Sequence, residues 1–196
     1  MKRNALYAVA LSSVFLFGCG GGDDGPSEPV PPTIGPLSQY VGTYSECSSG
    51  EKVQVVISQM DSNTLAVDYS SNYYANRNCT GAVVGVETYS APARFTYVST
   101  GTATVIDWPS DGRASSLTVD RFNLSAPRRT SSLTGSGVTR SDGRQCVTYG
   151  GGIFACLEDS TLPAVNVTGG LAVTDTAVLL VVEEQGVYVV DSVFPR

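Results

Sequence analysis

Residues 53–69 read VQVVISQMDSNTLAVDY and hold two short runs in which apolar and polar side chains alternate. The first run carries Val53, Val55 and Ile57, and the second carries Leu65, Val67 and Tyr69. Successive side chains of a β-strand point to opposite faces, so each run predicts a strand with one apolar face. The polar segment between the runs has the length and composition of a turn. The stretch therefore predicts a β-hairpin.

Similar apolar runs recur along the rest of the chain. They occupy residues 82–89, 93–99, 102–108, 114–124, 130–140, 177–183 and 187–194. Turn-forming segments separate several of them, including Thr100-Gly101 and Glu184-Gln185-Gly186. We expect an all-β fold of about eight to ten sequential antiparallel strands, arranged as a single barrel or a sandwich. Periodicity does not choose between these two architectures.

The tetrapeptide Ser-Asp-Gly-Arg occurs twice, at 110–113 and 141–144. A repeated ligand loop is one interpretation. The residues that flank the two copies differ, however, and Asp-Gly between apolar runs is a strong signal for a two-residue hairpin. We therefore expect both copies to form turns.

The N-terminus has the features of an export signal. Lys2 and Arg3 give it a positive start, residues 5–17 are mostly apolar, and Gly18 precedes Cys19. The apolar run is shorter than the roughly 20 residues that a spanning helix needs, which argues against a transmembrane segment. An ordinary secretory peptide cut elsewhere is the other alternative, but the polar, glycine-rich run after Cys19 suits a membrane tether better.

Leu16-Phe17-Gly18-Cys19 resembles the lipobox of bacterial lipoproteins. The resemblance implies a signal peptide at 1–18 that is removed, and a mature N-terminus at Cys19 that carries acyl chains and inserts into a lipid bilayer. In that family an Asp after the cysteine favours retention in an inner membrane, and this chain has Gly20. The expected location is thus the bacterial cell envelope, at the outer membrane where the cell has two.

A linker is expected to follow the lipidated cysteine. Residues 20–36 contain five glycines and five prolines among seventeen positions. Such a composition cannot build a packed core, so 19–36 is predicted to be a disordered linker and 37–196 a single β-domain. Removal of the signal leaves ten basic residues against eighteen acidic ones, a net charge of −8. A nucleic-acid partner is therefore not expected.

Four cysteines remain besides Cys19: Cys47, Cys79, Cys146 and Cys156. An even number in an exported chain indicates disulfides, for which three pairings exist. A hairpin centred on Gly151 would set Cys146 directly opposite Cys156, within reach of a disulfide. Cys47 and Cys79 then pair by elimination. Four distant thiolates could instead bind zinc, but the spacing lacks Cys-x-x-Cys and the chain has no histidine, so no metal or cofactor is expected.

The absence of histidine excludes any mechanism that uses imidazole as a base, including the Ser-His-Asp and Cys-His arrangements. A glycosidase needs only two carboxyl groups, and Asp107 beside Trp108 is the most suggestive acid. Trp108 is interpreted first as a core or rim residue at a strand end. Asp68, Glu87 and Asp120 are predicted to face solvent on their strands. We therefore expect a protein that is not an enzyme.

Candidate ligand-binding residues are the tyrosines Tyr69, Tyr73 and Tyr74, together with Trp108. The tyrosines precede Cys79 and could line a binding rim, although we prefer the interpretation that they cap an open end of a sheet. Ligand binding of this kind would need a concave pocket. Envelope structure, with an apolar patch or an open sheet edge that meets another envelope protein, is the alternative.

Two further stretches resemble known families. Tyr40-Val41-Gly42-Thr43-Tyr44 is similar to the start of lipocalin-like barrels, which implies a carrier of a small apolar ligand. Residues 44–55 of this acidic, lipid-anchored chain look like part of some periplasmic lysozyme inhibitors, which implies an inhibitor of a hydrolase. The sequence as a whole predicts a membrane-anchored lipoprotein with a non-catalytic binding or structural role.

Overall fold

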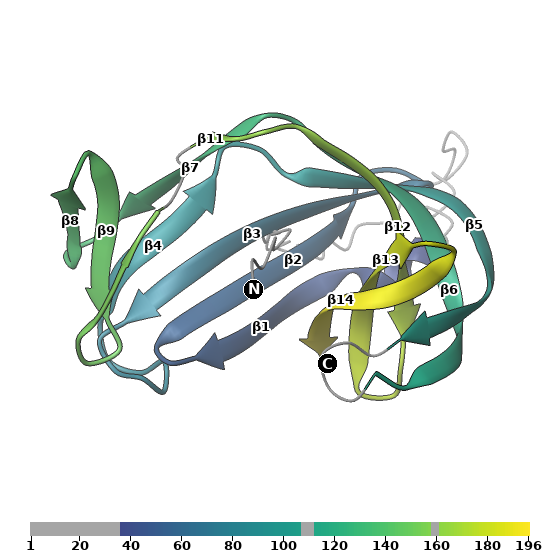
Figure 1. The fold of residues 1–196 in the computed structure, drawn as a ribbon, viewed down its shortest axis with the longest axis horizontal. Coiled ribbons are helices and arrows are strands. Elements are labelled where there is room, and N and C mark those ends of the chain that lie inside the picture. Colours follow the sequence, from purple (N-terminus) through teal and green to yellow (C-terminus); the bar gives the residue numbers. More distant parts are fainter. Residues whose placement is uncertain (1–35, 107–111, 158–160) are drawn as a thin grey trace, which may run out of the picture.

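The structure is a computed structural model that describes residues 36–106, 112–157 and 161–196, and it consists almost entirely of β-strands (Figure 1). The expected signal peptide at 1–18 lies outside the described residues, as does the expected linker up to residue 35. A short 3-10 helix, η1 (Pro36–Tyr40), opens the domain. The strands are β1 (Gly42–Ser48), β2 (Glu51–Gln59), β3 (Thr64–Tyr74), β4 (Val83–Tyr89), β5 (Ala93–Ile106), β6 (Ala114–Ala126), β7 (Arg129–Thr134), β8 (Val138–Ser141), β9 (Arg144–Tyr149), β10 (Ile153–Cys156), β11 (Thr161–Leu162), β12 (Val165–Val173), β13 (Ala177–Glu184) and β14 (Val187–Pro195).

The hairpin predicted at 53–69 is confirmed as β2 and β3. Val55 pairs with Tyr69 and Ile57 with Val67, so the apolar residues of both strands share one buried face. The turn is closed by the backbone N–H of Met60, which donates to Thr64 at 2.9 Å, and by the N–H of Asn63, which donates to the Asp61 carboxylate at 2.8 Å. Polar turn residues thus satisfy the backbone where the apolar alternation stops.

The main sheet follows the chain as eight successive antiparallel rows. Three rows each contain two strands in line: β4 with β5, β7 with β6, and β11 with β12. In sequence order the rows are β1, β2, β3, β4–β5, β6–β7, β11–β12, β13 and β14. The expectation of an all-β fold of sequential antiparallel strands is confirmed, with one exception. The last strand, β14, pairs in parallel with β5 through Tyr188–Val105 and Val189–Ile106.

Prolines mark the breaks within the three double rows. Pro92, Pro127 and Pro163 each lie between the two strands of a row. Arg94 pairs with Ser125 and Val165 with Ala126, so the three prolines fall within one residue of each other in register. Proline has no N–H for a ladder hydrogen bond, and the interruption therefore runs straight across three neighbouring rows. It separates β4, β7 and β11 from β5, β6 and β12.

Two predicted strand boundaries are wrong for related reasons. Residues 93–99 and 102–108 were expected as two strands, but β5 runs without a turn to Ile106, because Thr100 and Gly101 pair with Asp120 and Val119. Residues 107–108 lie outside the described residues. The runs at 114–124 and 130–140 were expected to pair with each other. They instead follow one another in a row up to Thr134, because Pro127 interrupts the ladder without reversing the chain.

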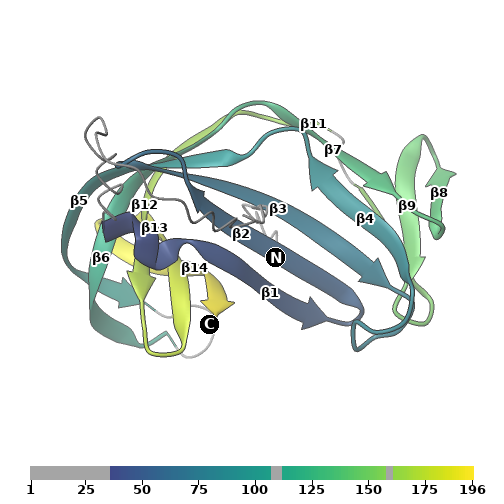
Figure 2. The same cartoon turned by 180° about the vertical axis from the view of Figure 1, so that it is seen from behind.

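The parallel pairing of β14 with β5 closes a ring of five strands, β5–β6–β12–β13–β14, at one end of the sheet (Figures 1 and 2). Six buried residues from these five strands make a ring core: Val105, Val119, Ala172, Val181, Tyr188 and Val190. Gly169 and Gly170 allow close packing here, since a Cβ on Gly170 would lie 2.4 Å from a Val119 methyl carbon. The remaining rows curl away from the ring as an open, curved sheet.

The central core lies between the curved sheet and the outer surface of the ring strands. It combines Val55, Ile57, Leu65, Val67 and Tyr69 of β2 and β3 with Phe95, Phe122, Leu171, Leu180 and Phe194 of the ring strands. Strand β1 meets β14 through side chains, with the Tyr44 and Phe194 rings 5.7 Å apart. Strands β6, β12 and β13 therefore bury both faces, one toward each core.

A separate three-stranded sheet, β8–β9–β10, sits at the opposite end of the molecule from the ring (Figure 1). Val147 and Tyr149 of β9 pack on Tyr73 and Leu133 of the main sheet. The Gln145 side chain bonds both backbone groups of Leu133, donating to its carbonyl at 2.8 Å and accepting from its N–H at 3.2 Å. The Asp142-Gly143 turn joins β8 and β9, with φ of 51° and 78°, as expected for the second Ser-Asp-Gly-Arg copy. Ser110 and Asp111 of the first copy lie outside the described residues.

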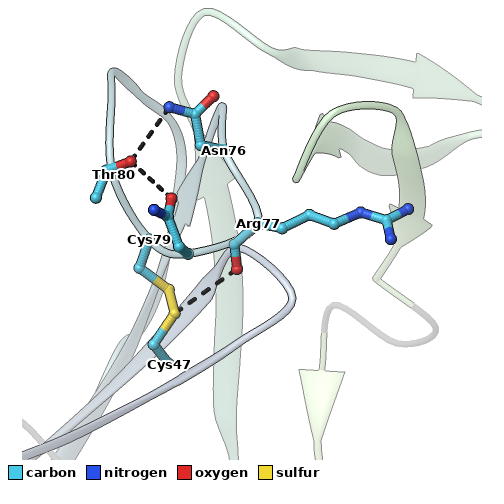
Figure 3. The surroundings of a disulfide bond; sticks show 6 residues. Cys47, Asn76, Arg77, Cys79 and Thr80 are labelled. Atoms are coloured by element: carbon cyan, nitrogen blue, oxygen red, sulfur yellow. Dashed lines mark hydrogen bonds between the residues drawn. A yellow bond between two sulfur atoms is a disulfide. The ribbon is translucent and has the colours of Figure 1, made fainter.

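Both disulfides form in the predicted pairing. Cys146 is opposite Cys156 in the β9–β10 hairpin, with Tyr149 opposite Ile153, and the two cysteines are joined. Cys47 at the end of β1 is joined to Cys79 in the β3–β4 loop, with the two Cα atoms 6.0 Å apart (Figure 3). Hydrogen bonds among Asn76, Asn78 and Thr80 hold that loop, and the Arg77 side chain extends away from it to the Gly150 carbonyl at 3.1 Å.

Candidate functional site

A network of tyrosines and carboxylates lies on the inner face of β2, β3 and β4. The ladder sets Glu51 opposite Tyr73 and Ser71 opposite Glu87, which places all four side chains on one face. Tyr73 and Tyr89 each donate a hydrogen bond to Glu87, both at 2.9 Å and to different carboxyl oxygens. Ser71 donates to Glu51 at 2.6 Å. The hydroxyl groups of this network are thus used to hold its two carboxyl groups.

Burial governs the electrostatics of this network. Glu87 is 8% exposed, and burial raises the pKa of its carboxyl group, although the hydrogen bonds from Tyr89 and Tyr73 act in the opposite direction. Burial also raises the pKa of Tyr73, and the neighbouring Glu87 and Glu51 add to the effect. Beside them, the Arg129 guanidinium stacks 5.0 Å from the centre of the Tyr89 ring, and burial lowers its pKa.

A second buried carboxylate, Asp120, joins η1 to the ring strands. Its side chain is 3% exposed and accepts hydrogen bonds from the Tyr40 hydroxyl at 2.7 Å, from the Gln39 amide at 3.1 Å and from the Thr100 hydroxyl. Three donors satisfy both carboxylate oxygens, so the group is hydrogen-bonded although it is buried. Burial and the contact with Asp120 raise the pKa of Tyr40. Asp120 therefore anchors the start of the domain.

The expectation that Asp120, Glu87 and Asp68 face solvent is wrong for the first two. On β6, Phe122 and Leu124 belong to the same face as Asp120, and that face packs against the central core. On β4, Glu87 lies with Gly85 and Tyr89 on the inner face of the curved sheet. Asp68 is half-buried. The apolar residue Val86 of β4 lies on the opposite face from Glu87, which misleads an assignment by hydrophobicity alone.

The predicted ligand-binding residues are divided among different surroundings. Tyr69 and Tyr73 are buried, and the Tyr73 ring packs edge-on against Tyr149 at 4.9 Å, beneath the small sheet. The small sheet therefore covers Tyr73, which caps the end of the main sheet and does not line an open rim. Tyr74 is half-buried on the opposite face of β3. Asp107, Trp108 and Cys19, the expected lipidation residue, lie outside the described residues.

The ring opens at one end into a pocket of about 510 Å³, which we call the ring-mouth pocket. Polar side chains from the ring strands line it: Ser99 and Thr104 of β5, Arg121 and Asn123 of β6, Thr168 of β12 and Glu183 of β13. Val98 stands at its lip and is 55% exposed. A β-bulge between Tyr97 and Ser99 leaves Val98 without a ladder partner on β6, and bulges often redirect side chains next to sites of function.

Arg121 is the feature of this pocket that is hardest to explain by packing. Its Nε–H is buried and has no hydrogen-bond acceptor in the described part of the chain. Arg121 and Glu183 both act on Tyr188 at the side of the pocket: burial raises the pKa of the Tyr188 hydroxyl, Glu183 raises it further and Arg121 lowers it. The pocket thus brings together one cation, one carboxylate and several neutral hydrogen-bonding groups.

No protein family, curated protein or solved structure matches this chain. The roles of its residues therefore rest on their chemistry and their positions. Among the described residues, no group of three or more cysteine, aspartate and glutamate side chains is arranged to hold a metal ion. No helix of the described ranges is long and apolar enough to cross a bilayer.

Sequence reasoning missed Arg121 and the pocket around it. The chain shows an arginine between Asp120 and Phe122 with nothing to distinguish it from other strand arginines. The sequence does hold one signal for the ring. The apolar residues of β6 shift from odd positions, Leu117 and Val119, to even positions, Phe122 and Leu124, and so from one face of the strand to the other. Such a change indicates a strand with two buried faces. It does not indicate that the ring closes, since closure depends on a pairing between β14 and β5 that is far apart in sequence.

Proposed function

We propose that this chain is a lipid-anchored protein of the bacterial cell envelope whose β-domain has a non-catalytic, ligand-binding role. The observation that carries the proposal is the use of cysteines. All four cysteines of the domain pair with one another, which fits a protein exported to an oxidising compartment and leaves Cys19, after the signal-like segment, for lipidation.

Acylation of Cys19 would make the bilayer the first partner of the protein. Each buried CH₂ of an acyl chain contributes about 0.8 kcal/mol, so three chains form a durable anchor. Residues 20–36 then separate the domain from the membrane by up to about 50 Å, at roughly 3.1 Å per residue. This distance gives the ring-mouth pocket room to meet a small molecule or an envelope component.

A binding role is favoured over a purely structural one by the pocket itself. Ligand sites are concave and carry a few polar groups that fix orientation, and the ring-mouth pocket has both features. Its polar lining suits a hydrophilic ligand, in contrast to the apolar ligand that the lipocalin-like start implies. The outer membrane is the proposed location, because Gly20 follows the cysteine.

Lipidation is tested by Cys19→Ser in cells fed radiolabelled palmitate. The wild type should take up label, migrate at its processed size and sediment with membranes in high salt. Cys19→Ser should carry no label and retain its full precursor length. Gly20→Asp is the matched control, which should stay lipidated but move to the inner-membrane fraction. A normally processed Cys19→Ser protein would refute the lipoprotein assignment.

A further inference from the structure

The ring-mouth pocket has an apolar floor and a polar opening. The ring core fills one end of the ring with Val105, Val119 and Val181. Toward the other end the inward-facing side chains become polar, at Arg121 on β6 and at Thr168 on β12. The ring strands are rigidly paired around this opening, so these side chains are held in place before any ligand arrives.

Arg121 is positioned to use its guanidinium edge on a ligand. Its partner on β5 is Ser99, and the adjacent Gly101 has no side chain. A Cβ on Gly101 would lie 3.7 Å from the Arg121 Nη2 atom, which shows that the guanidinium extends over the glycine. The Nε–H is buried and has no acceptor in the part of the chain that the structure describes. The protein encloses this Nε–H, so the terminal Nη groups of Arg121 are the donors that an acceptor on a ligand can reach in the pocket.

The shape of the guanidinium limits the ligand class. Its planar N–H donors form a fork that matches two oxygens of a carboxylate or of a phosphate. Glu183, which also lines the pocket, repels a doubly charged phosphate more strongly than a singly charged carboxylate. Around it, Asn123 and the hydroxyls of Ser99, Thr104 and Thr168 suit hydroxyl or amide groups. The exposed Val98 offers an apolar surface at the lip. The volume of about 510 Å³ corresponds to a small molecule.

We propose that the ring-mouth pocket binds a small, hydrophilic carboxylate-bearing molecule, with Arg121 as the residue that holds the carboxylate. Acidic sugars and amino acids or short peptides share this chemistry. The inference rests on the proposed binding role of the domain and names the ligand class of that same site. Glu183 distinguishes acidic sugars from amino acids and short peptides. Its carboxylate repels a ligand that is only an anion and attracts a ligand that also carries an ammonium group.

Calorimetric titration of the purified full-length protein in detergent tests the proposal with four probes. These are D-glucuronate, glycylglycine, D-glucose as the neutral sugar and inorganic phosphate as an anion of different shape. We expect D-glucuronate or glycylglycine to bind, D-glucose to bind at least tenfold more weakly, and the affinity to fall as salt increases. Arg121→Gln should weaken carboxylate binding by at least about tenfold. Arg128→Gln, at an exposed arginine outside the pocket, should leave it unchanged.

Two further variants keep the result interpretable. Arg121→Lys retains the charge without the fork, and should bind more weakly than wild type but more tightly than Arg121→Gln, with an unchanged melting temperature as the check on folding. Glu183→Gln should strengthen binding of D-glucuronate and weaken that of glycylglycine. Equal affinity for glucose and glucuronate, tighter binding of phosphate, wild-type affinity in Arg121→Gln, or no binding of either carboxylate would each overturn the proposal. Equal binding of both sugars would leave a binding role intact, and palmitate labelling of Cys19 tests the anchor independently.

Discussion

At the residue scale, the two carboxyl groups that are buried among the described residues are held by hydroxyl and amide donors. Glu87 receives hydrogen bonds from Tyr73 and Tyr89, and Asp120 receives them from Tyr40, Thr100 and Gln39. Tyrosine is well suited to this role because its ring packs in a core while its hydroxyl group reaches a polar partner. Tyr40, Tyr73 and Tyr89 therefore serve as packing residues that also satisfy buried carboxyl groups.

Glu87 should make stability depend on pH. Burial raises the pKa of its carboxyl group in the folded state above the unfolded value of about 4.3, so its contribution to stability is fully present below that value and is lost as pH rises through the folded pKa. Glu87→Gln cannot ionise. We therefore expect its stability relative to wild type to increase from about pH 4 to pH 7, by about 1.4 kcal/mol for each unit by which the pKa is raised.

Urea unfolding at several pH values measures this difference. Glu184→Gln, at an exposed glutamate beside the β13–β14 turn, is the matched control for the loss of a carboxyl group. The half-buried Asp68, whose pKa is also raised by burial, remains present in both proteins and cancels in the comparison. A Glu87→Gln profile with the same slope as that of the control would show that folding does not raise the pKa of the Glu87 carboxyl group.

Single residues also show what the sequence could reveal. The pairing of Cys146 with Cys156 follows from hairpin symmetry about Gly151, because the constraint is local. The surroundings of Glu87 and Asp120 do not follow, because each depends on which rows come to lie above its strand. The partners of Asp120 illustrate the difference, since Tyr40 is eighty positions away in the sequence.

At the element scale, strands that serve two cores explain most of the departures from simple alternation. Along β6, Leu117 and Val119 face the ring, whereas Phe122 and Leu124 face the central core. Bulges shift the register of the β5–β6 and β13–β14 ladders. On β5, Phe95 and Tyr97 before the bulge face the central core, whereas Ala103 and Val105 after it face the ring core. Hairpins such as β2–β3, in which most apolar residues alternate onto one face, are predicted well from sequence. The sequence predicts only part of β5 and β6, and it does not predict the ring that these strands form with β12, β13 and β14.

Glycines in the ring should differ sharply in their tolerance of a methyl group. A Cβ on Gly170 would lie 2.4 Å from a Val119 methyl carbon and 2.8 Å from the Asp120 carbonyl oxygen, so the ring would have to open. We expect Gly170→Ala to lower the free energy of unfolding by about 1 to 3 kcal/mol. The matched variant Gly101→Ala places its methyl group 3.7 Å from the nearest atom and should be neutral or stabilising by up to about 1 kcal/mol.

Denaturant unfolding of both glycine variants checks the closure of the ring. The comparison is informative because both glycines lie on ring strands and face the same interior. Equal losses in the two variants would mean that any side chain in these strands is harmful for reasons of backbone conformation. A loss confined to Gly170→Ala would place the tight contact where β6 and β12 meet.

At the scale of the whole molecule, the domain combines the large main sheet with the small sheet β8–β9–β10, which shares no ladder with it in the described residues. Each row of the main sheet pairs with its sequence neighbours, and the β14–β5 pairing joins the last row to the middle of the chain. The sheet β8–β9–β10 forms ladders only within itself, in the described residues. It contacts the main sheet through Val147, Tyr149 and Gln145, and its β9–β10 turn donates backbone hydrogen bonds from Gly150 to Tyr74 and from Gly151 to Ala75, both at 2.8 Å. The two disulfides are divided between these two units, which predicts different consequences of their loss.

Removal of the Cys47–Cys79 bond should weaken the whole domain, whereas removal of the Cys146–Cys156 bond should weaken the small sheet first. In the chain-entropy description, a crosslink between residues 32 positions apart contributes about 3 to 4 kcal/mol, and one across 10 positions about 2.5 to 3 kcal/mol. We expect Cys47→Ser/Cys79→Ser to lose most of the larger amount in global unfolding by urea. In Cys146→Ser/Cys156→Ser the loss should appear as faster amide hydrogen exchange in residues 138–156, with exchange in β2 and β3 little changed, because β8–β10 can open without breaking a main-sheet ladder.

Each double variant is the control for the other. Equal global losses in both would mean that Val147 and Tyr149 bind the small sheet into the same cooperative unit as the main sheet.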